Sequence, residues 1–215
     1  MISPPVNRAP RADAERNRRL VLDTAARVFA DRGGSATLND VARAAGVGVG
    51  TVYRKFADKE AILDALFDEK IADLERLADE ASQVHDPGAA VRGFLWALIE
   101  KRATDRGLDA ILTTPARNLR FTDELAREFL PAVDRLVARA IDAGELRPGF
   151  SGQEVCLLAF MVGKVADVTR PSDPEVWRRY AQLLIDGTRV SAAAAPLEPA
   201  PLSFTAAAAA LGRAG

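Results

Sequence analysis

One segment of the chain carries side chains suited to contacting duplex DNA. Residues 37–63 are TLNDVARAAGVGVGTVYRKFADKEAIL. In such a segment an arginine can donate a forked pair of hydrogen bonds to guanine, a threonine can contact a base edge or a phosphate, and a valine can pack on a thymine methyl group. The candidate DNA-binding residues are Thr37, Val49, Gly50, Thr51, Tyr53, Arg54, Lys55 and Lys59.

These candidates divide by the part of the DNA that each could reach. Arg54 is suited to a base edge in the major groove. Tyr53 and Lys55 are better placed for the sugar-phosphate flank, which positions a protein without reading sequence. Lys59 stands at the start of the next expected helix, where its charge and the exposed backbone amides would together attract a phosphate.

Two short helices are expected to position these side chains. Thr37 is a good N-cap, and Asp40, three residues later, can complete a capping box that opens a helix through Ala45. Gly46 can take the left-handed conformation that ends this helix and turns the chain sharply. A second short helix then follows over about 48–56.

The apolar positions of the segment fit a helix-turn-helix. This motif needs a buried face on the first helix, an apolar residue just after the turn, and apolar anchors on the second helix. With those positions turned inward, helical geometry points the candidate DNA-binding residues of the second helix outward. The apolar positions are filled, in order, by Val41, Ala42, Val47, Val52 and Phe56.

The same segment resembles the TetR family of transcriptional regulators. The family motif is a Gly-Val turn, a Gly/Pro-Thr-Leu/Val/Ile-Tyr core, two polar or aromatic residues, Phe, and a Lys-Glu that opens the fourth helix. The helix ending in VFADRG (28–33) also resembles the family's first helix, so that roughly residues 16–67 are covered. This chain carries, in the same order, Gly46-Val47, Gly50-Thr51-Val52-Tyr53, Arg54-Lys55-Phe56 and Lys59-Glu60.

At two positions the chain departs from the family pattern. Gly48 stands where the family usually has serine at the cap of the recognition helix, and Val49 stands where many members have a polar residue. Glycine still permits the cap geometry, at a loss of a few tenths of a kcal/mol relative to serine. We therefore expect base recognition to rely on shape and methyl contacts more than on hydrogen bonds.

The resemblance implies a function for the whole chain. It implies a ligand-responsive, sequence-specific transcriptional regulator, a repressor by family default, that binds a pseudo-palindromic operator in double-stranded DNA. It also implies a homodimer, because two recognition helices about one helical turn apart contact enough base pairs for specific binding. An unknown small-molecule effector would release the DNA.

The distribution of charge favours the same interpretation. Residues 1–59 hold 11 Lys and Arg against 6 Asp and Glu, whereas residues 60–215 hold 18 against 24, and the whole chain has a net charge of −1. A basic head on an acidic body is typical of a nucleic-acid binder, although a chance excess on a solvated face would look alike. The basic residues Arg8, Arg11, Arg16, Arg18 and Arg19 either add phosphate attraction or form a solvated helix end.

The fold class expected from the pattern is all-α. Helices are expected over about 13–32, 37–45, 48–56, 58–84, 88–105, 108–114, 122–143, 151–169 and 173–190, about nine in total. The domains are a disordered basic arm (1–12), a helix-turn-helix DNA-binding domain (13–67) whose fourth helix continues to about 84, a helical effector-binding and dimerisation domain (68–190), and a flexible Ala/Pro-rich tail (191–215).

The second domain carries weaker signals. The run 155–162 is apolar on every side, so we expect it to be covered both by its own core and by a second subunit. The expected dimer interface is Val155, Leu158, Val162, Tyr180, Leu184 and Gly187. A ligand pocket is expected from Trp96, Phe121, Phe129, Phe160 and Met161, each of which could equally be core. Arg102, Arg117 and Arg120 could meet an acidic ligand, but solvated surface is the expectation.

Other classes of protein fit the sequence less well. The LacI family has a similar headpiece, but there it begins almost at the N-terminus and precedes a large α/β domain. A helical enzyme would need a paired nucleophile and base, a metal cluster or a phosphate loop; we expect no catalytic residue, metal site or cofactor. Cys156 is expected in the core and His85 in an exposed loop. No apolar run is long enough for a bilayer and no secretory signal is present, so a cytoplasmic protein without a membrane partner is expected.

Overall fold

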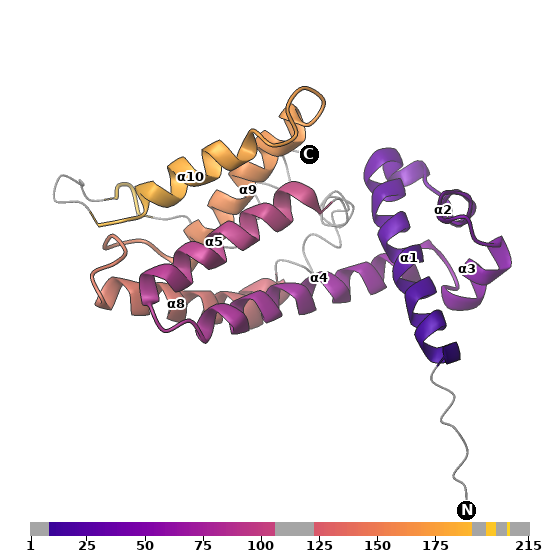
Figure 1. Cartoon of the computed structure of the whole chain (residues 1–215), viewed down its shortest axis with the longest axis horizontal. Coiled ribbons are helices and arrows are strands. Elements are labelled where there is room, and N and C mark those ends of the chain that lie inside the picture. Colours follow the sequence, from indigo (N-terminus) through magenta and orange to yellow (C-terminus); the bar gives the residue numbers. More distant parts are fainter. Residues whose placement is uncertain (1–8, 106–122, 191–196, 201–205, 207–215) are drawn as a thin grey trace, which may run out of the picture. The chain divides into compact units, whose positions relative to one another are not determined.

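The computed structural model describes residues 9–105, 123–190, 197–200 and 206 of the 215-residue chain. Within these residues the fold is all-α, as predicted, with eight α-helices and one isolated bridge between Leu146 and Arg189 (Figure 1). The chain divides into two compact units, one holding the described residues up to 68 and the other those from 69 onward. The expected helix over 108–114 lies outside the described residues.

The first unit is a small helical domain. It contains α1 (Ala9–Arg32), a 3₁₀ turn (Gly33–Ser35), α2 (Leu38–Ala45), α3 (Val49–Lys55) and the first part of α4 (Lys59–Ser82) (Figure 1). Helix α2 contacts both α1 and α3. The buried side chains of this unit include Val21, Leu22, Phe29, Val41, Val52, Phe56, Ile62 and Phe67.

Helix α1 begins earlier than the sequence predicted. We expected a disordered arm over 1–12, but the helix starts at Ala9, so residues 9–12 are helical. Pro10 is compatible with this start because a proline in the first helical turn lacks only an N–H that would have no intrahelical partner. The rest of the expected arm, 1–8, lies outside the described residues.

The second unit is built around α5 (Pro87–Thr104). Helix α5 contacts α8 (Leu130–Asp142), α9 (Gly152–Thr169) and α10 (Trp177–Gly187), and α9 also contacts α8 and α10. Being covered on several sides, α5 is apolar around most of its circumference. Its buried residues include Val91, Phe94, Leu95, Leu98, Ile99 and Arg102.

Two helices of this unit differ from their expected bounds near prolines. In the helix expected over 122–143, residues Leu125–Phe129 form a π-helical turn before α8. Pro131 supplies a reason, because its missing N–H cannot bond to the carbonyl four residues earlier. The last helix begins at Trp177 instead of 173, after a turn that contains Pro171 and Pro174.

Capping residues also open α5 and α9 in this unit. Asp86 accepts a hydrogen bond from Ala89 N at 2.8 Å at the start of α5. Ser151 and Glu154 form a capping box at the start of α9. None of the described helices is both long enough and apolar enough to cross a membrane.

Candidate DNA interface

A capping box starts α2, the first helix of the helix-turn-helix. Asp40 N donates to Thr37 Oγ1 at 3.2 Å, while Thr37 N and Oγ1 donate to Asp40 Oδ2 at 3.0 and 2.7 Å. The hydrogen bond from the Thr37 hydroxyl, followed by that from its backbone N–H, lowers the pKa of Asp40. Arg32, the last residue of α1, pairs with Asp40 at 2.8 Å. The predicted N-cap is confirmed, and the Thr37 hydroxyl proton is already donated within the protein.

Gly46 forms the turn between α2 and α3. Its φ is 67°, in the left-handed region that glycine adopts without steric cost. The turn is held by Val47 N, which donates to Ala42 O at 3.1 Å. Beyond the turn Val52 is fully buried and Phe56 is buried, so the second helix is anchored by the two side chains that its sequence pattern predicted.

Helix α3 presents its other side to solvent. Val49 is 44% exposed and Tyr53 is 49% exposed, and Gly50 and Arg54 are exposed as well. Thr51 and Lys55 are half-buried. Large apolar or aromatic side chains held at the surface of a seven-residue helix are suited to a contact that the single chain does not make.

The start of α3 has no side-chain cap. Gly48 is the N-cap residue, with extended backbone and no side-chain hydrogen bond. Its backbone carbonyl accepts from Thr51 N at 2.8 Å. A Cβ atom at Gly48 would meet only Thr51 Oγ1, at 3.7 Å, so the position has space for the serine that the family usually has there.

Lys59 is held against the end of α1. Its Nζ donates to Gly33 O at 3.2 Å and lies 5.1 Å from the centre of the Phe29 ring. It is the first residue of α4, whose N-terminus is capped by Asp58 through a 2.8 Å bond from Ala61 N. The sequence placed Lys59 at this helix start but carried no signal for the contact with Gly33, which is 26 residues away.

Two family models match the chain. Residues 21–66 match the bacterial regulatory proteins of the tetR family, and residues 86–190 match the C-terminal domain of SbtR-like transcriptional regulators. The chain belongs to the TetR family of transcriptional regulators. The resemblance noted above is confirmed, and the chain is a helix-turn-helix regulator, not an enzyme.

Individual relatives agree with the family. An uncharacterized HTH-type transcriptional regulator of Bacillus subtilis, YhgD, is 36% identical over 89 residues, which are 40% of this chain and 47% of that protein. The match thus spans about half the length of this curated relative. A TetR regulatory protein from Mycobacterium vanbaalenii superposes with a TM-score of 0.59 at 26% identity, over 84% of this chain and 99% of that one.

A third comparison concerns the fold alone. The transcriptional regulator FadR from Bacillus subtilis, solved in complex with stearoyl-CoA, has a TM-score of 0.58 at 20% identity. The alignment covers 80% of this chain and 99% of that chain.

The described pocket candidates of this TetR-family regulator have different aromatic or charged neighbours, and the pocket itself stays a prediction. Phe129 is buried with its ring 5.9 Å from that of Phe94, and Trp96 lies 5.9 Å from Trp177. Phe160 lies beneath Arg102, whose Cζ is 5.7 Å from the ring centre. Met161 is 55% exposed on α9, so it does not belong to the core, which was the alternative expectation. Phe121 lies outside the described residues.

The position of Arg102 differs from the one expected from sequence. It was expected at the solvated surface, but it is 5% exposed and pairs with Asp167 at 3.0 Å. Gly163 makes this burial possible, because a Cβ atom there would lie 2.3 Å from Arg102 Cγ. A glycine in the interior of a helical pattern was the available signal, since it often has a packing reason. Arg117 and Arg120 lie outside the described residues.

Two of the six residues expected in the dimer interface need revision. The side chains of Val155 and Val162 are buried inside their own unit, at 0% and 1% exposure, so they present no surface to a second subunit. Tyr180 and Gly187 are exposed. Leu158 and Leu184 are half-buried. The apolar run of α9 is therefore divided between an inner face on α5 and an outer face.

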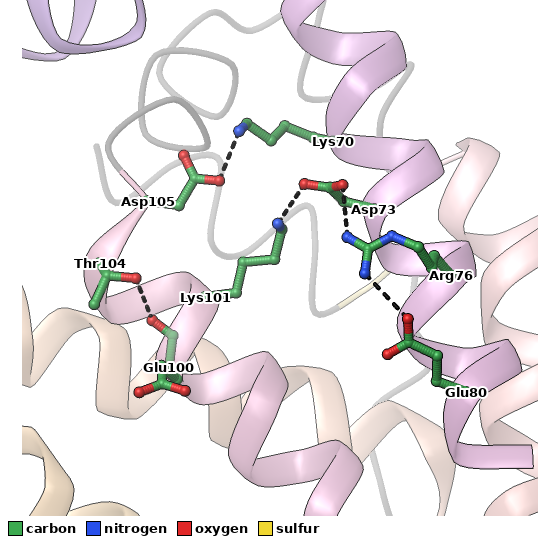
Figure 2. A network of polar contacts seen from close by, with 8 residues as sticks. All are labelled: Lys70, Asp73, Arg76, Glu80, Glu100, Lys101, Thr104 and Asp105. Atoms are coloured by element: carbon green, nitrogen blue, oxygen red, sulfur yellow. Dashed lines mark hydrogen bonds and ion pairs between the residues drawn. The ribbon is translucent and has the colours of Figure 1, made fainter. Parts of the chain in front are cut away.

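A network of charged side chains joins α4 to the end of α5 (Figure 2). Asp73 of α4 accepts hydrogen bonds from Lys101 and, at 3.0 Å, from Arg76. Burial alone would raise the pKa of Asp73, but these hydrogen bonds outweigh it and lower the pKa. One turn earlier Lys70 pairs with Asp105, the residue that ends α5, at 2.7 Å.

The remaining chemical candidates behave as structural residues. His85 is exposed, as expected. Burial raises the pKa of the Cys156 thiol to about 12, so it carries little thiolate at neutral pH. Within the described part of the chain, no group of histidine, cysteine and carboxylate side chains is arranged to hold a metal ion.

Proposed function

We propose that this regulator binds a pseudo-palindromic operator as a homodimer, represses transcription there, and is released by a small-molecule effector. The observation that carries the proposal is α3: a short helix anchored by Val52 and Phe56, with Val49 and Tyr53 held at the surface. A braced helix with an exposed outer face is the form in which a recognition helix enters the major groove.

The side chains of this helix contact different parts of the DNA. Arg54, Thr51 and Val49 face base edges, and Gly50 allows the backbone to approach the DNA closely. Tyr53 and Lys55 contact the sugar-phosphate flank. Lys59 adds a phosphate contact at the start of α4. Thr37 contributes by capping the start of α2, since its hydroxyl and its backbone N–H are both donated to Asp40.

The dimer forms through the outer faces of α9 and α10. On α9 Met161 is 55% exposed and Val168 is 80% exposed. On α10 Tyr180 is 44% exposed and Leu183 is 59% exposed. These positions recur at helical spacing, so each helix carries one apolar stripe, with the half-buried Leu158 and Leu184 at its edge and Gly187 at its end. Two such pairs pack as a four-helix interface.

The effector is a small molecule bound by the second unit. Support comes from the structural relative that binds stearoyl-CoA and from the aromatic side chains Trp96, Phe129 and Phe160 in this chain, with Phe121 retained as a candidate. Release follows if the effector binds better to the conformation that does not fit DNA.

Selection from a random pool of duplex DNA tests the operator claim. The purified full-length protein should enrich sequences with two half-sites related by a dyad, centred about one helical turn apart. Arg54→Ala should lose about 1–3 kcal/mol of discrimination at one base pair of each half-site. Arg43→Ala, on the exposed side of α2, is the matched control. Enrichment of no common sequence would contradict the proposal.

Sedimentation equilibrium tests the dimer. Leu183→Glu places a charge in the proposed interface and should shift the protein to monomer. Val190→Glu is the control, because Val190 is 50% exposed but lies beyond the end of α10. If the Leu183→Glu variant remained a dimer, the interface would have to lie on other residues, and the proposed interface would be wrong.

A further inference from the structure

The N-terminal part of helix α1 precedes the buried positions that the structure describes in it. Its first described buried side chain is Val21, yet the helix begins at Ala9. The residues 9–20, called here the α1 extension, correspond to about 18 Å of helix at 1.5 Å per residue. In Figure 1 this end of α1 extends beyond α2 and α3. The family match begins at residue 21, so the α1 extension precedes the matched domain.

The α1 extension is rich in arginine. It contains Arg11, Arg16, Arg18 and Arg19 against Asp13 and Glu15. Arg16 pairs with Asp13, three residues earlier on the same helix. Arg18 makes a contact of longer range, because its Cζ lies 5.4 Å from the centre of the Phe56 ring. Phe56 is the C-cap residue of α3 and is buried.

Helical geometry explains why Arg18 reaches α3 and Arg16 does not. Arg18 lies four, seven and eleven residues before Leu22, Ala25 and Phe29, all buried on the side of α1 that faces the core of its unit. Arg16 is two residues earlier, about 200° around the helix, and so lies nearly opposite. The guanidinium of Arg18 is therefore beside the C-terminal end of the recognition helix.

We propose that the α1 extension is a second DNA-contact element, in which Arg18 binds a backbone phosphate of duplex DNA just outside the base pairs that α3 faces. This inference rests on the proposed binding of α3 to DNA. A guanidinium is suited to the role because it donates paired hydrogen bonds to phosphate oxygens. Stacking on Phe56 holds the side chain in place, which reduces the conformational entropy lost on binding.

The alternative is that Arg18 only braces Phe56 and the end of α3. Salt dependence separates the two roles, because each phosphate contact contributes about 0.9 to the slope of log affinity against log salt concentration. A bracing residue affects affinity without a matching change in that slope.

The experiment compares Arg18→Gln, Arg18→Lys and Arg16→Ala with the wild type in the full chain. Fluorescence anisotropy measures the affinity for a duplex recovered by selection and for a random-sequence duplex, between about 50 and about 200 mM salt. Arg18→Gln should weaken binding to both duplexes and reduce the slope by about 0.9 per chain bound. Arg18→Lys should keep the slope, and Arg16→Ala should leave it near that of the wild type.

A second measurement does not depend on the folded stability of the variant. Neutral methylphosphonates are placed one at a time in the duplex backbone outside the bases that selection identifies. One of them should weaken wild-type binding and leave Arg18→Gln binding unchanged, because the variant has already lost that contact.

The outcomes distinguish this inference from the function on which it rests. Equal slopes for Arg18→Gln and Arg16→Ala, or no flanking methylphosphonate effect specific to Arg18, would overturn the α1 extension as a DNA contact and leave the α3 interface standing. If the wild type bound neither duplex, the proposed DNA binding would fail and this inference with it.

Discussion

Lys70 and Asp105 join α4 to the end of α5 through an ion pair of 2.7 Å in which the Lys70 side chain is only 11% exposed (Figure 2). A charge pair so far removed from water interacts more strongly than one at the surface, and the loss of one partner leaves the other charge less well compensated. The same two helices are also joined by the more exposed contacts of Asp73. The stability lost when a buried ion pair is removed can therefore be compared with the loss from a more exposed pair in the same network.

Lys70→Met should lower the free energy of unfolding by about 1–3 kcal/mol, because the Asp105 carboxylate loses a partner in a largely buried position. Arg76→Ala removes ion pairs to Asp73 and Glu80, where the Arg76 side chain is 57% exposed, and should cost less than about 1 kcal/mol. Urea unfolding measures both. Equal losses in the free energy of unfolding for the two variants would contradict the argument that burial makes the Lys70–Asp105 pair the stronger one.

Gly163→Ala should destabilise the second unit by about 1–3 kcal/mol, since the added methyl group would overlap Arg102 Cγ. Gly93→Ala, on the exposed side of α5, has nothing within 4 Å of the new atom. It should stabilise the protein by up to about 1 kcal/mol through helix propensity. Thermal unfolding of the two variants should thus shift in opposite directions. A neutral Gly163→Ala would mean that Arg102 can move aside.

Asp40→Asn should remove part of the pH dependence of stability in acid. The hydrogen bonds from Thr37 lower the folded-state pKa of Asp40 below its ordinary value of 3.8. Its contribution is therefore complete above pH 3.8 and is lost as the pH falls through the lower folded-state value. Unfolding measured at a series of acidic pH values should show a shallower decline in the variant. Asp23→Asn, on the exposed side of α1, is the control, and identical profiles for both variants would refute the effect.

Cys156 should react with a thiol reagent only when the protein unfolds. Its pKa of about 12 leaves very little thiolate at neutral pH, and the residue is only partly exposed. Labelling with Ellman's reagent in buffer should be slow and should become fast and complete in concentrated urea. Rapid labelling in buffer would instead favour a redox role for this cysteine.

The features predicted from sequence are those with a local cause. The capping box at Thr37 and the turn at Gly46 depend on residues three or four positions apart, so their hydrogen bonds could be inferred from residue type and spacing. The burial of Val52 and Phe56 followed from helical periodicity in the same way. This local determination explains why the helix-turn-helix could be recognised before any tertiary structure was considered.

The features that only the tertiary structure decided join residues far apart in the chain. Arg102 is buried because Gly163, on another helix, leaves space for its stem, and Val155 is buried because α9 packs against other helices of its unit. The contact of Arg18 with Phe56 is of the same kind. Periodicity states that a helix has an apolar side, but the partner of that side depends on how the helices pack. For this protein, sequence alone determined the DNA-binding motif, and packing decided which arginines and apolar side chains remain at the surface to contact something else.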